Sequence, residues 1–462
     1  MSSAEPHPTP ASQPDKPRRR WLRVALLTAL IGIGVIGMVL IVIGLRPGPV
    51  RPEAVGASAS TTSDGGDRSS SDRTRIQELP FVPWEGGPAY WKKFPNAVDW
   101  TDPTFFPIGI WYGNVSSDEE VVFDKSKGIN TYVEMWEGTD FDLLARNEVY
   151  WLGRGLVNQD DSSKYNPGVF LDDEVDGRYE PEKGLEHLAR LRAKMGTDRF
   201  TWANFTQLVI GPDLEQRYQL EFVNQTADAV SVDMYWYSIP FCDWKPYRGD
   251  LYAVPVPQQT CRTAHSYGLS QEALRLRDAT DGRLQPTWTW VENFNGLSGQ
   301  DPRPYITGGQ LKGAAMATLI HEARALMWFN QSFTGPCQTG NVIRQAQVDP
   351  ASGCGRQYAA NIEAMSEVNH LVSSLAPILN TQSRQWSFGT GLDTMLKVHD
   401  GHAYIFAMTD GTSGRRTFRL PKGIGGNSAE VVGEGRAVAL DGDSFSDNFS
   451  DEYTYHVYKI NL

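Results

Sequence analysis

The sequence predicts a (β/α)8 TIM barrel of the α/β class, followed by a small antiparallel β-sandwich and preceded by one transmembrane helix. Three features carry this prediction: an uncharged apolar run near the N-terminus, eight β-type runs that alternate with helical stretches, and a C-terminal part made of short strands. The chain has 462 residues, of which 40% are hydrophobic. It is therefore too apolar for a disordered protein and long enough for one large and one smaller domain.

The N-terminal part predicts a membrane anchor. Residues 24–45 (VALLTALIGIGVIGMVLIVIGL) carry no charge and are long enough to cross a ~30 Å hydrocarbon core as a helix. Basic residues crowd residues 1–23, which are therefore expected to stay in the cytoplasm, with everything after Arg46 outside. A cleaved signal peptide is the alternative, but its apolar region would be only about 7–15 residues long. We expect a single-pass plasma-membrane protein.

Residues 46–78 are rich in Pro, Gly, Ser, Thr and Asp and have no apolar periodicity, which is typical of a flexible linker. Charge divides along the same line. Residues 1–51 have a net charge of +5, so the remainder carries −17 of the total of −12. An acidic exterior disfavours nucleic acid and anionic lipid as ligands of the external part and says little about neutral ligands.

The four cysteines all follow the predicted anchor, as expected for an oxidising compartment. Four cysteines allow three pairings, and proximity in the sequence favours Cys242–Cys261 and Cys337–Cys354. A zinc site is the other interpretation, but there is no CxxC motif or Cys/His cluster with metal-ligand spacing. The histidines, His321 among them, are not expected to form a site, so we predict neither a metal nor a cofactor.

Residues 79–383 are expected to form the barrel. Strands that are apolar on both faces and separated by helices indicate a parallel sheet with helical crossovers, and eight such units indicate a closed barrel. The predicted strands span 105–113, 129–138, 148–155, 168–174, 199–205, 229–238, 286–294 and 324–333. Amphipathic stretches at 181–196 and 308–323 are expected to be helices, and 369–380 a closing helix.

Residues 384–462 have a different pattern from the barrel. Short strands alternate there with turns of Gly, Asp and Ser (DTMLKVHDG, HAYIFAMTDG, RRTFRLP, AEVVGEGRAVAL, YTYHVYKI), and no long helix fits. This pattern predicts the small antiparallel β-sandwich.

Carboxylates stand where two of the predicted barrel strands end. The fourth strand runs into Asp172, Asp173 and Glu174 (GVFLDDEVDG), and the seventh ends at Glu292 (WTWVENFN). Active sites of such barrels form at the carboxyl ends of the strands. Alternation along a strand would put Asp172 and Glu174 on one face, with Asp173 opposite. The competing interpretations are a solvated acidic loop, or a calcium site without EF-hand spacing that also uses Asp176.

Several motifs resemble those of the large (β/α)8 clan of glycoside hydrolases: FFPIGIW, DDEVD, ARALMWFNQSF, LAPILN and the tail EGRAVALDGDSFSDNFSDEYTYHVYKI. The clan carries an acid/base glutamate at the end of strand 4 and a nucleophilic glutamate at the end of strand 7. The resemblance implies these roles for Glu174 and Glu292, with retention of stereochemistry. It also implies that Tyr235, or Tyr237, bonds the nucleophile and that Trp328 stacks on the sugar. One departure is Asp173, which stands where the clan commonly has an asparagine that touches the substrate.

Chemistry supports the same assignment. Glycosidic cleavage needs one carboxyl group that protonates the leaving oxygen and a second that stabilises or attacks the oxocarbenium-like centre. The first must stay protonated near neutral pH, and burial or a neighbouring carboxylate raises its pKa. The expected substrate-binding residues are Asp172, Asp173, Tyr235, Tyr237, Trp290, Asn293 and Trp328.

Aromatic residues gather near the predicted strand ends, among them Trp111, Trp136 and Trp290. Rings of this kind pack against the flat C–H faces of sugars, although core packing explains any single one equally well. The expected partner is an oligo- or polysaccharide of the cell envelope or its surroundings. One alternative is a non-catalytic glycan-binding or wall-tethering protein. A weaker one is a scaffold whose β-sandwich recruits a protein.

Overall fold

The computed structural model describes residues 74–462 except 155–158, 280–281, 294–304 and 334. The predicted cytoplasmic tail, the transmembrane helix at 24–45 and most of the linker lie outside the described residues. Within the described part of the chain, no helix is both long and apolar enough to cross a membrane. The barrel and the C-terminal strands belong to one compact unit, Thr61–Leu462.

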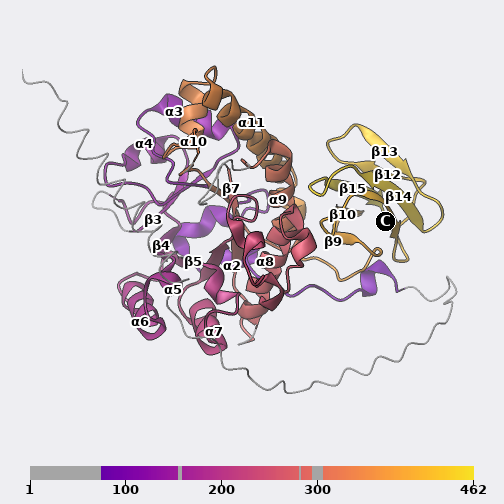
Figure 1. Cartoon of the computed structure of the whole chain (residues 1–462), viewed down its shortest axis with the longest axis horizontal. Helices are drawn as coiled ribbons and strands as arrows, with labels where there is room; N and C mark the ends of the chain where they lie inside the picture. Colours follow the sequence, from indigo (N-terminus) through magenta and orange to yellow (C-terminus); the bar gives the residue numbers. More distant parts are fainter. Residues whose placement is uncertain (1–73, 155–158, 280–281, 294–304, 334) are drawn as a thin grey trace, which may run out of the picture. The chain divides into compact units, whose positions relative to one another are not determined.

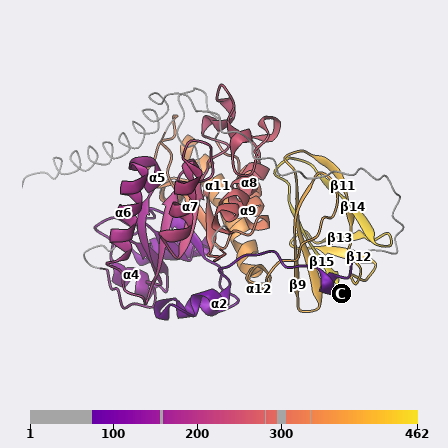
Figure 2. The ribbon, with the colours of Figure 1, turned by 90° about the horizontal axis from the view of Figure 1, so that it is seen from below.

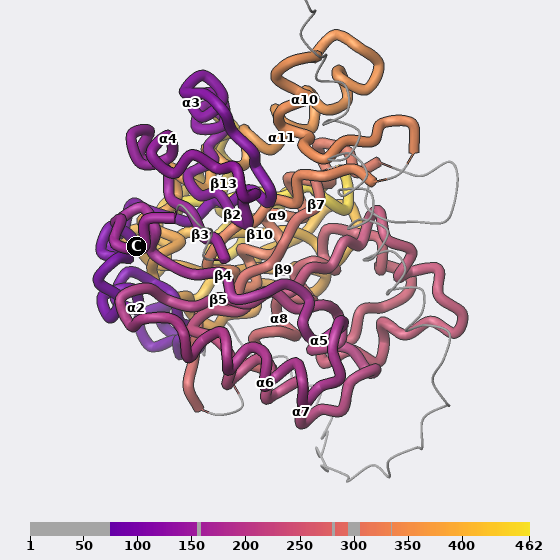
Figure 3. The backbone as a smooth tube through the Cα atoms, turned by 90° about the vertical axis from the view of Figure 1, so that its left-hand side faces the viewer, coloured from indigo at the N-terminus to yellow at the C-terminus, as the bar shows by residue number. Residues whose placement is uncertain are grey.

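Eight parallel strands form a closed barrel in sequence order, and β1 closes it by pairing with β8 through Ile108 and Leu326. Strands β3, β4 and β5 follow one another in Figure 1, and Figure 3 shows the same order from β2 to β5. Each strand lies within its predicted run, so the barrel is confirmed. The strands are β1 (Ile108–Trp111), β2 (Thr131–Val133), β3 (Tyr150–Gly153), β4 (Gly168–Asp173), β5 (Phe200–Phe205), β6 (Ala229–Asp233), β7 (Thr287–Glu292) and β8 (Leu326–Phe329).

The strands form because both of their faces are buried, which favours bulky and β-branched residues. Inward-facing rings fill the barrel interior, with Phe170, Trp202 and Trp288 among the completely buried side chains. Outward-facing residues pack on the surrounding helices, as where Gln271 Nε2 of α8 donates to Thr287 of β7. The barrel is therefore a solid core, and open space for a ligand can form only at its ends.

Helices surround the barrel (Figure 1). Local signals set their ends: Pro181 begins α6 at a position where its missing N–H is not needed, and Thr307 with Gln310 forms a capping box on α9. The helices are α2 (Pro88–Trp91), α3 (Asp118–Ser126), α4 (Phe141–Arg146), α5 (Val175–Arg178), α6 (Pro181–Arg192), α7 (Gln216–Gln225), α8 (Ala264–Asp278), α9 (Gly308–Ile320), α10 (Val342–Val348), α11 (Gly353–Ser374) and α12 (Ala376–Leu379).

The helices predicted at 181–196 and 308–323 are present and end three or four residues earlier. The closing helix at 369–380 is different. The structure divides this stretch between the end of α11, which begins at Gly353, and the short α12. Pro377 explains the break, because a proline lacks the N–H that would continue α11 and fits only in the first turn of a new helix.

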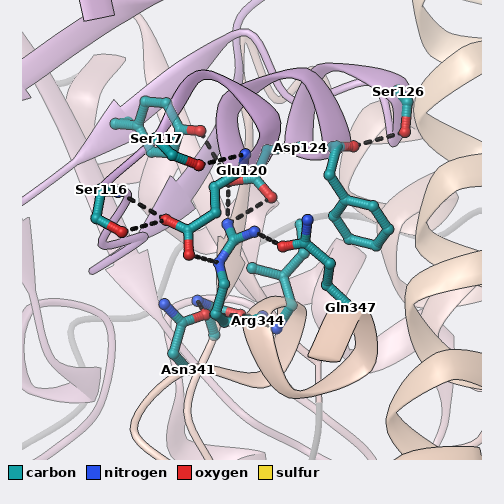
Figure 4. A network of polar contacts seen from close by, with 12 residues as sticks. Ser116, Ser117, Glu120, Asp124, Ser126, Asn341, Arg344 and Gln347 are labelled. Carbon is teal, nitrogen blue, oxygen red and sulfur yellow. Dashed lines mark hydrogen bonds and ion pairs between the residues drawn. The ribbon is translucent and has the colours of Figure 1, made fainter. Parts of the chain in front are cut away.

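An ion-pair network joins α3 to α10 beside the seam where the barrel closes (Figure 4). Arg344 Nη2 donates to both oxygens of Asp124, at 2.7 and 2.6 Å, and the Tyr132 hydroxyl donates to Asp124 at 2.7 Å. Asp124 is completely buried, and this burial raises its pKa to about 6 against the opposing effect of Arg344. The network therefore connects α10, which follows the last barrel strand, to α3, which follows the first.

The C-terminal part holds two antiparallel sheets, of order β13-β12-β15-β10-β9 and β11-β14 (Figure 2). Phe418 and Phe445 of the smaller sheet share one core with Ile405 and Tyr458 of the larger. The prediction of an antiparallel β-domain is confirmed. Its strands are β9 (Leu392–His399), β10 (His402–Thr409), β11 (Gly414–Arg419), β12 (Ser428–Val431), β13 (Arg436–Ala439), β14 (Ser444–Phe449) and β15 (His456–Asn461).

The end of the predicted linker is part of this β-domain. A short 3-10 helix, Ile76–Glu78, lies there, and Ile76 is completely buried in the core of the β-domain. Both disulfides occur as proximity in the sequence predicted: Cys242–Cys261 lies after β6, and Cys337–Cys354 joins the segment after β8 to the first turn of α11.

Candidate active site

The carboxyl ends of three barrel strands carry non-glycine residues in the left-handed region. Tyr112 after β1, Glu134 after β2 and Glu174 after β4 have φ values of 53°, 48° and 48°. Each N–H still bonds the next strand, as Glu174 N does to Asn204 O at 3.0 Å. Such conformations cost about 1–3 kcal/mol each and cluster at functional sites. They mark this end of the barrel as the candidate active site.

The end of β4 is irregular, and this decides where its acids point. The register with β5 shifts between Phe170 and Asp173, so that Asp173 pairs with the inward-facing Asn204. Asn204 Nδ2 donates to Asp173 Oδ1 at 2.9 Å. The prediction that Asp172 shares a face with Glu174, opposite Asp173, is therefore wrong, because the bulge interrupts the alternation on which it rested.

Asp172 is held by two guanidinium groups and a histidine instead. Its oxygens lie 2.6 Å from Arg154 Nη1, 2.6 Å from Arg178 Nη2 and 2.7 Å from His187 Nε2 of α6. Burial would raise the pKa of Asp172, but the guanidinium groups of Arg178 and Arg154 outweigh it and lower the pKa below its usual range. Asp172 is therefore ionised near neutral pH, and its ion pairs support the turn that presents Glu174.

The side chains of Glu174 and Asp233, at the ends of β4 and β6, are hydrogen-bonded to each other. Burial, and then the negative charge of Asp173, raise the pKa of Glu174 to about 8. Burial and the charge of Glu174 raise the pKa of Asp233 well above its usual range. Two carboxylates in contact cannot both ionise cheaply, so the pair holds at least one proton at neutral pH.

Three of the acidic residues at the site are partly exposed, unlike Glu292. Asp173, Glu174 and Asp233 are each partly exposed, although Asp233 Oδ1 itself is buried. Asp173 has a raised pKa because of burial, opposed by the hydrogen bond from Asn204 and by the charge of Arg154. Together the three residues form an accessible acidic cluster at the mouth of the barrel, which we call the carboxyl cluster.

Glu292 differs from this cluster because it is completely buried, with 0% exposure. Its Oε1 accepts hydrogen bonds from the backbone N–H groups of Tyr237 and Ser238, at 2.9 and 3.3 Å, and from the Tyr267 hydroxyl. Its Oε2 is buried as well, and burial raises the pKa of Glu292 to about 7. Glu292 therefore anchors the segment that follows β6.

Tyr235 is the residue that lies among both sets of acids. Burial raises its pKa well above the usual range, and the charges of Asp233, Asp173, Glu174 and Glu292 add to this. Its phenol is thus neutral and can donate a hydrogen bond. Tyr237 points elsewhere, because its hydroxyl donates to Glu452 of the β-domain at 2.9 Å.

The other predicted substrate-binding residues are buried. Trp290 Nε1 donates to Asn204 Oδ1 at 2.9 Å inside the barrel. Asn293 has no exposed surface and contacts Met365 Sδ at 3.6 Å. Trp328, expected to stack on a sugar, faces outward from β8 and donates to Asn369 of α11 at 2.9 Å. These three side chains act in packing, and Trp290 supports the mouth through Asn204.

Sequence reasoning missed Asp233, Asn204 and Arg154. The predicted sixth strand ran to residue 238, whereas β6 ends at Asp233, so its terminal acid was read as part of the strand interior. Asp233 would have been found by applying to β6 the rule that singled out β4 and β7, namely a carboxylate at the strand end. The roles of Asn204 and Arg154 depend on the bulge and on contacts between strands, which no pattern in the sequence signals.

Comparisons with known proteins concern the fold. No protein-family model matches the chain, and no curated protein matches its sequence. A solved GH30 endoxylanase from Clostridium papyrosolvens has 11% identity and a TM-score of 0.41, covering 78% of this chain and 97% of that one. A structure described as a glycoside hydrolase has 11% identity and a TM-score of 0.47, covering 77% and 92%. An Anoxybacillus alpha-amylase has 9% identity and a TM-score of 0.38, covering 78% and 98%.

Proposed function

We propose that the protein is a glycoside hydrolase whose working carboxyl groups are Glu174 and Asp233. The observation that carries the proposal is the hydrogen-bonded, partly exposed Glu174–Asp233 pair with raised pKa values at the mouth of the barrel. A carboxyl group that keeps its proton at neutral pH is what a glycosidic leaving oxygen requires.

In the proposed mechanism, the glycosidic oxygen enters between the two side chains and replaces their mutual hydrogen bond. In the singly protonated pair, Glu174 passes the shared proton to the leaving oxygen as the C–O bond breaks. Both carboxylates are then ionised, and the positive oxocarbenium-like centre relieves their repulsion. Two neighbouring negative carboxylates are therefore unfavourable in the free enzyme but stabilise the positive charge of the transition state.

Asp233 replaces Glu292 as the proposed second carboxylate. A nucleophile must reach the anomeric carbon, and the complete burial of Glu292 argues against that role. Inverting enzymes hold a water between carboxyl groups about 6.5–9.5 Å apart. The Glu174–Asp233 contact leaves no such gap, so we propose retention. Asp233 attacks the anomeric carbon as the glycosidic C–O bond breaks, and a water then releases the sugar from Asp233 with Glu174 as its base. Glu292 is proposed as a positioning residue that fixes the chain after Asp233.

The proposed substrate is a neutral or weakly charged glycan. Trp136, three residues beyond the end of β2, is 47% exposed and could offer a ring to a sugar face. The acidic charge of the external part disfavours polyanionic glycans.

We also propose that residues 24–45 anchor the enzyme in the plasma membrane with its barrel outside. The uncharged run, the basic residues before it and the two disulfides support this location. Deleting residues 24–45 should move the protein from the membrane fraction to the soluble fraction. A deleted form that sediments with membranes as the full chain does would contradict the proposal.

The activity is tested with the full chain in detergent against a panel of envelope and plant oligosaccharides, with new reducing ends measured. We expect turnover of at least one glycan, lowered about 10²–10⁴-fold by Glu174→Gln. Glu186→Gln, at an exposed position on α6, is the matched control and should be fully active. Glycan binding without turnover by the parent chain would favour the non-catalytic alternative, and equal activity of Glu174→Gln would refute the proposal.

A further inference from the structure

A second cluster of polar side chains lies between the barrel and the β-domain. His265 lies in the first turn of α8, His321 follows α9, and Asp393 is the second residue of β9. Asp393 Oδ2 lies 3.0 Å from His265 Nδ1 and 2.9 Å from His321 Nε2. One carboxylate oxygen therefore faces two imidazole nitrogens contributed by two other elements.

These three atoms have the chemistry and spacing of a metal-binding set. One potential ligand atom from each residue lies within 4.8 Å of the others. Imidazole nitrogen and carboxylate oxygen are typical zinc ligands, whereas magnesium and calcium prefer sites made of oxygen alone. A zinc ion bound at about 2.0–2.2 Å to each atom would sit among them after small side-chain movements.

The surroundings of His321 complete the arrangement. Its other ring nitrogen, Nδ1, lies 3.1 Å from Glu272 Oε2 on α8. Histidines that ligate metals usually donate their second N–H to a carboxylate in this way, which fixes the tautomer and the ring orientation. Glu272 therefore holds His321 with Nε2 directed at Asp393.

A glycine makes room for the ring. Gly268 stands one turn after His265 on α8, and a Cβ at this position would lie 2.3 Å from His321 Cδ2 and 2.7 Å from Nε2. Glycine weakens a helix interior by about 0.5–1 kcal/mol relative to alanine. Its presence in α8 is explained by the close approach of His321, which brings both histidines to Asp393.

We propose that His265 Nδ1, His321 Nε2 and Asp393 Oδ2 bind a zinc ion that joins the barrel to the β-domain. The side chains of His265, His321 and Asp393 are 14%, 11% and 10% exposed, which leaves access for the ion and for a water as fourth ligand. On binding, zinc replaces the ring hydrogens that face Asp393, and these leave as protons to solvent. The site is independent of the proposed hydrolytic activity.

The test uses the untagged full chain in detergent, stripped with a chelator and then titrated with Zn²⁺ against a chromophoric competitor. We expect one zinc per chain by elemental analysis and a rise in Tm when zinc is added. His321→Gln and Asp393→Asn should weaken zinc binding at least 100-fold. Glu272→Gln should weaken it about 10–100-fold, because it removes only the support of the ring.

His370→Gln is the matched control, since His370 is an exposed histidine of α11 that bonds Ser126 O. It should bind zinc as the parent chain does. If a ligand variant fails to fold, Glu272→Gln and Gly268→Ala test the proposal instead. Neither substitution removes a zinc ligand, and both disturb the position of the His321 ring. A parent chain that binds no zinc and shows no change in Tm would overturn the proposal and leave an ion-pair network only. Unchanged zinc binding by Glu272→Gln and Gly268→Ala, or by the ligand variants, would also overturn it.

Discussion

Replacing Glu174 by glutamine is expected to stabilise the protein while it removes the activity. The pKa of Glu174 is raised from 4.5 to about 8 in the folded chain. Between these values the unfolded chain has lost the proton and the folded chain keeps it, so stability falls as pH rises from about 4.5 to about 8. Each pKa unit is worth ~1.4 kcal/mol, which gives a penalty of about 3 kcal/mol at pH 7 and about 5 kcal/mol at pH 9.

Glutamine keeps the shape of Glu174 and removes this penalty. Because the side chain is partly exposed, solvent screening reduces the effect, and we expect a gain of about 2 kcal/mol at pH 7 and about 3 kcal/mol at pH 9. For a unit of roughly 390 residues this corresponds to a rise in Tm of about 2–3 °C at pH 7 and about 4 °C at pH 9. At pH 4 the two proteins should unfold at the same temperature.

Tm is measured by tryptophan fluorescence at pH 4, 7 and 9 for the parent chain, Glu174→Gln and the surface control Glu186→Gln. The control should follow the parent chain at every pH. A Glu174→Gln chain that melts at or below the temperature of the parent at pH 9, or whose gain is the same at all three pH values, would refute the reasoning about the Glu174–Asp233 pair.

Further predictions concern pH, the supports of the site and the barrel seam. In the activity profile, kcat/KM should fall tenfold per pH unit above about pH 8, where Glu174 loses its proton, and a profile flat to pH 10 would count against Glu174 as the acid. Asp172→Asn leaves Arg154 and Arg178 without their shared carboxylate and should cost on the order of 3 kcal/mol in urea unfolding, and an unchanged midpoint would contradict this. Arg344→Met leaves the buried Asp124 carboxylate without its ion-pair partner and should lower the free energy of unfolding by about 3–5 kcal/mol. Adding Asp124→Asn should restore part of this stability, and no recovery would show that the ion pair is not the cause. The double variant Cys337→Ser and Cys354→Ser opens a 17-residue connection and should lose about 3 kcal/mol, and a Tm equal to that of the oxidised parent would exclude this contribution.

Much of the fold could be predicted because its signals are local. Each barrel strand is a short apolar run, and all eight lie inside their predicted ranges, whereas β14 of the β-domain falls between two predicted runs. The disulfides follow from proximity, since each closes a connection of fewer than twenty residues. Helix ends were predicted less accurately, and Pro377, the signal that ends α11, was read as the interior of one helix.

The site could be predicted only in part because its geometry depends on contacts between strands. The acids at the end of β4 were found, but the bulge after Phe170 exchanges the faces expected for Asp172 and Asp173. The burial of Glu292 follows from the folding of the segment after β6 over it, which strand counting cannot reveal. The meeting of His265 with Asp393 joins the barrel to the β-domain across more than a hundred residues.

The most direct measurement compares kcat/KM of Asp233→Asn and Glu292→Gln on the glycan that the parent chain hydrolyses. If Glu174 and Asp233 are the working pair, Asp233→Asn should lose at least about 10³-fold, as Glu174→Gln does, whereas Glu292→Gln should stay within about tenfold of the parent. The opposite result, an active Asp233→Asn and an inactive but folded Glu292→Gln, would return the nucleophile to β7 and contradict the carboxyl pair proposed here.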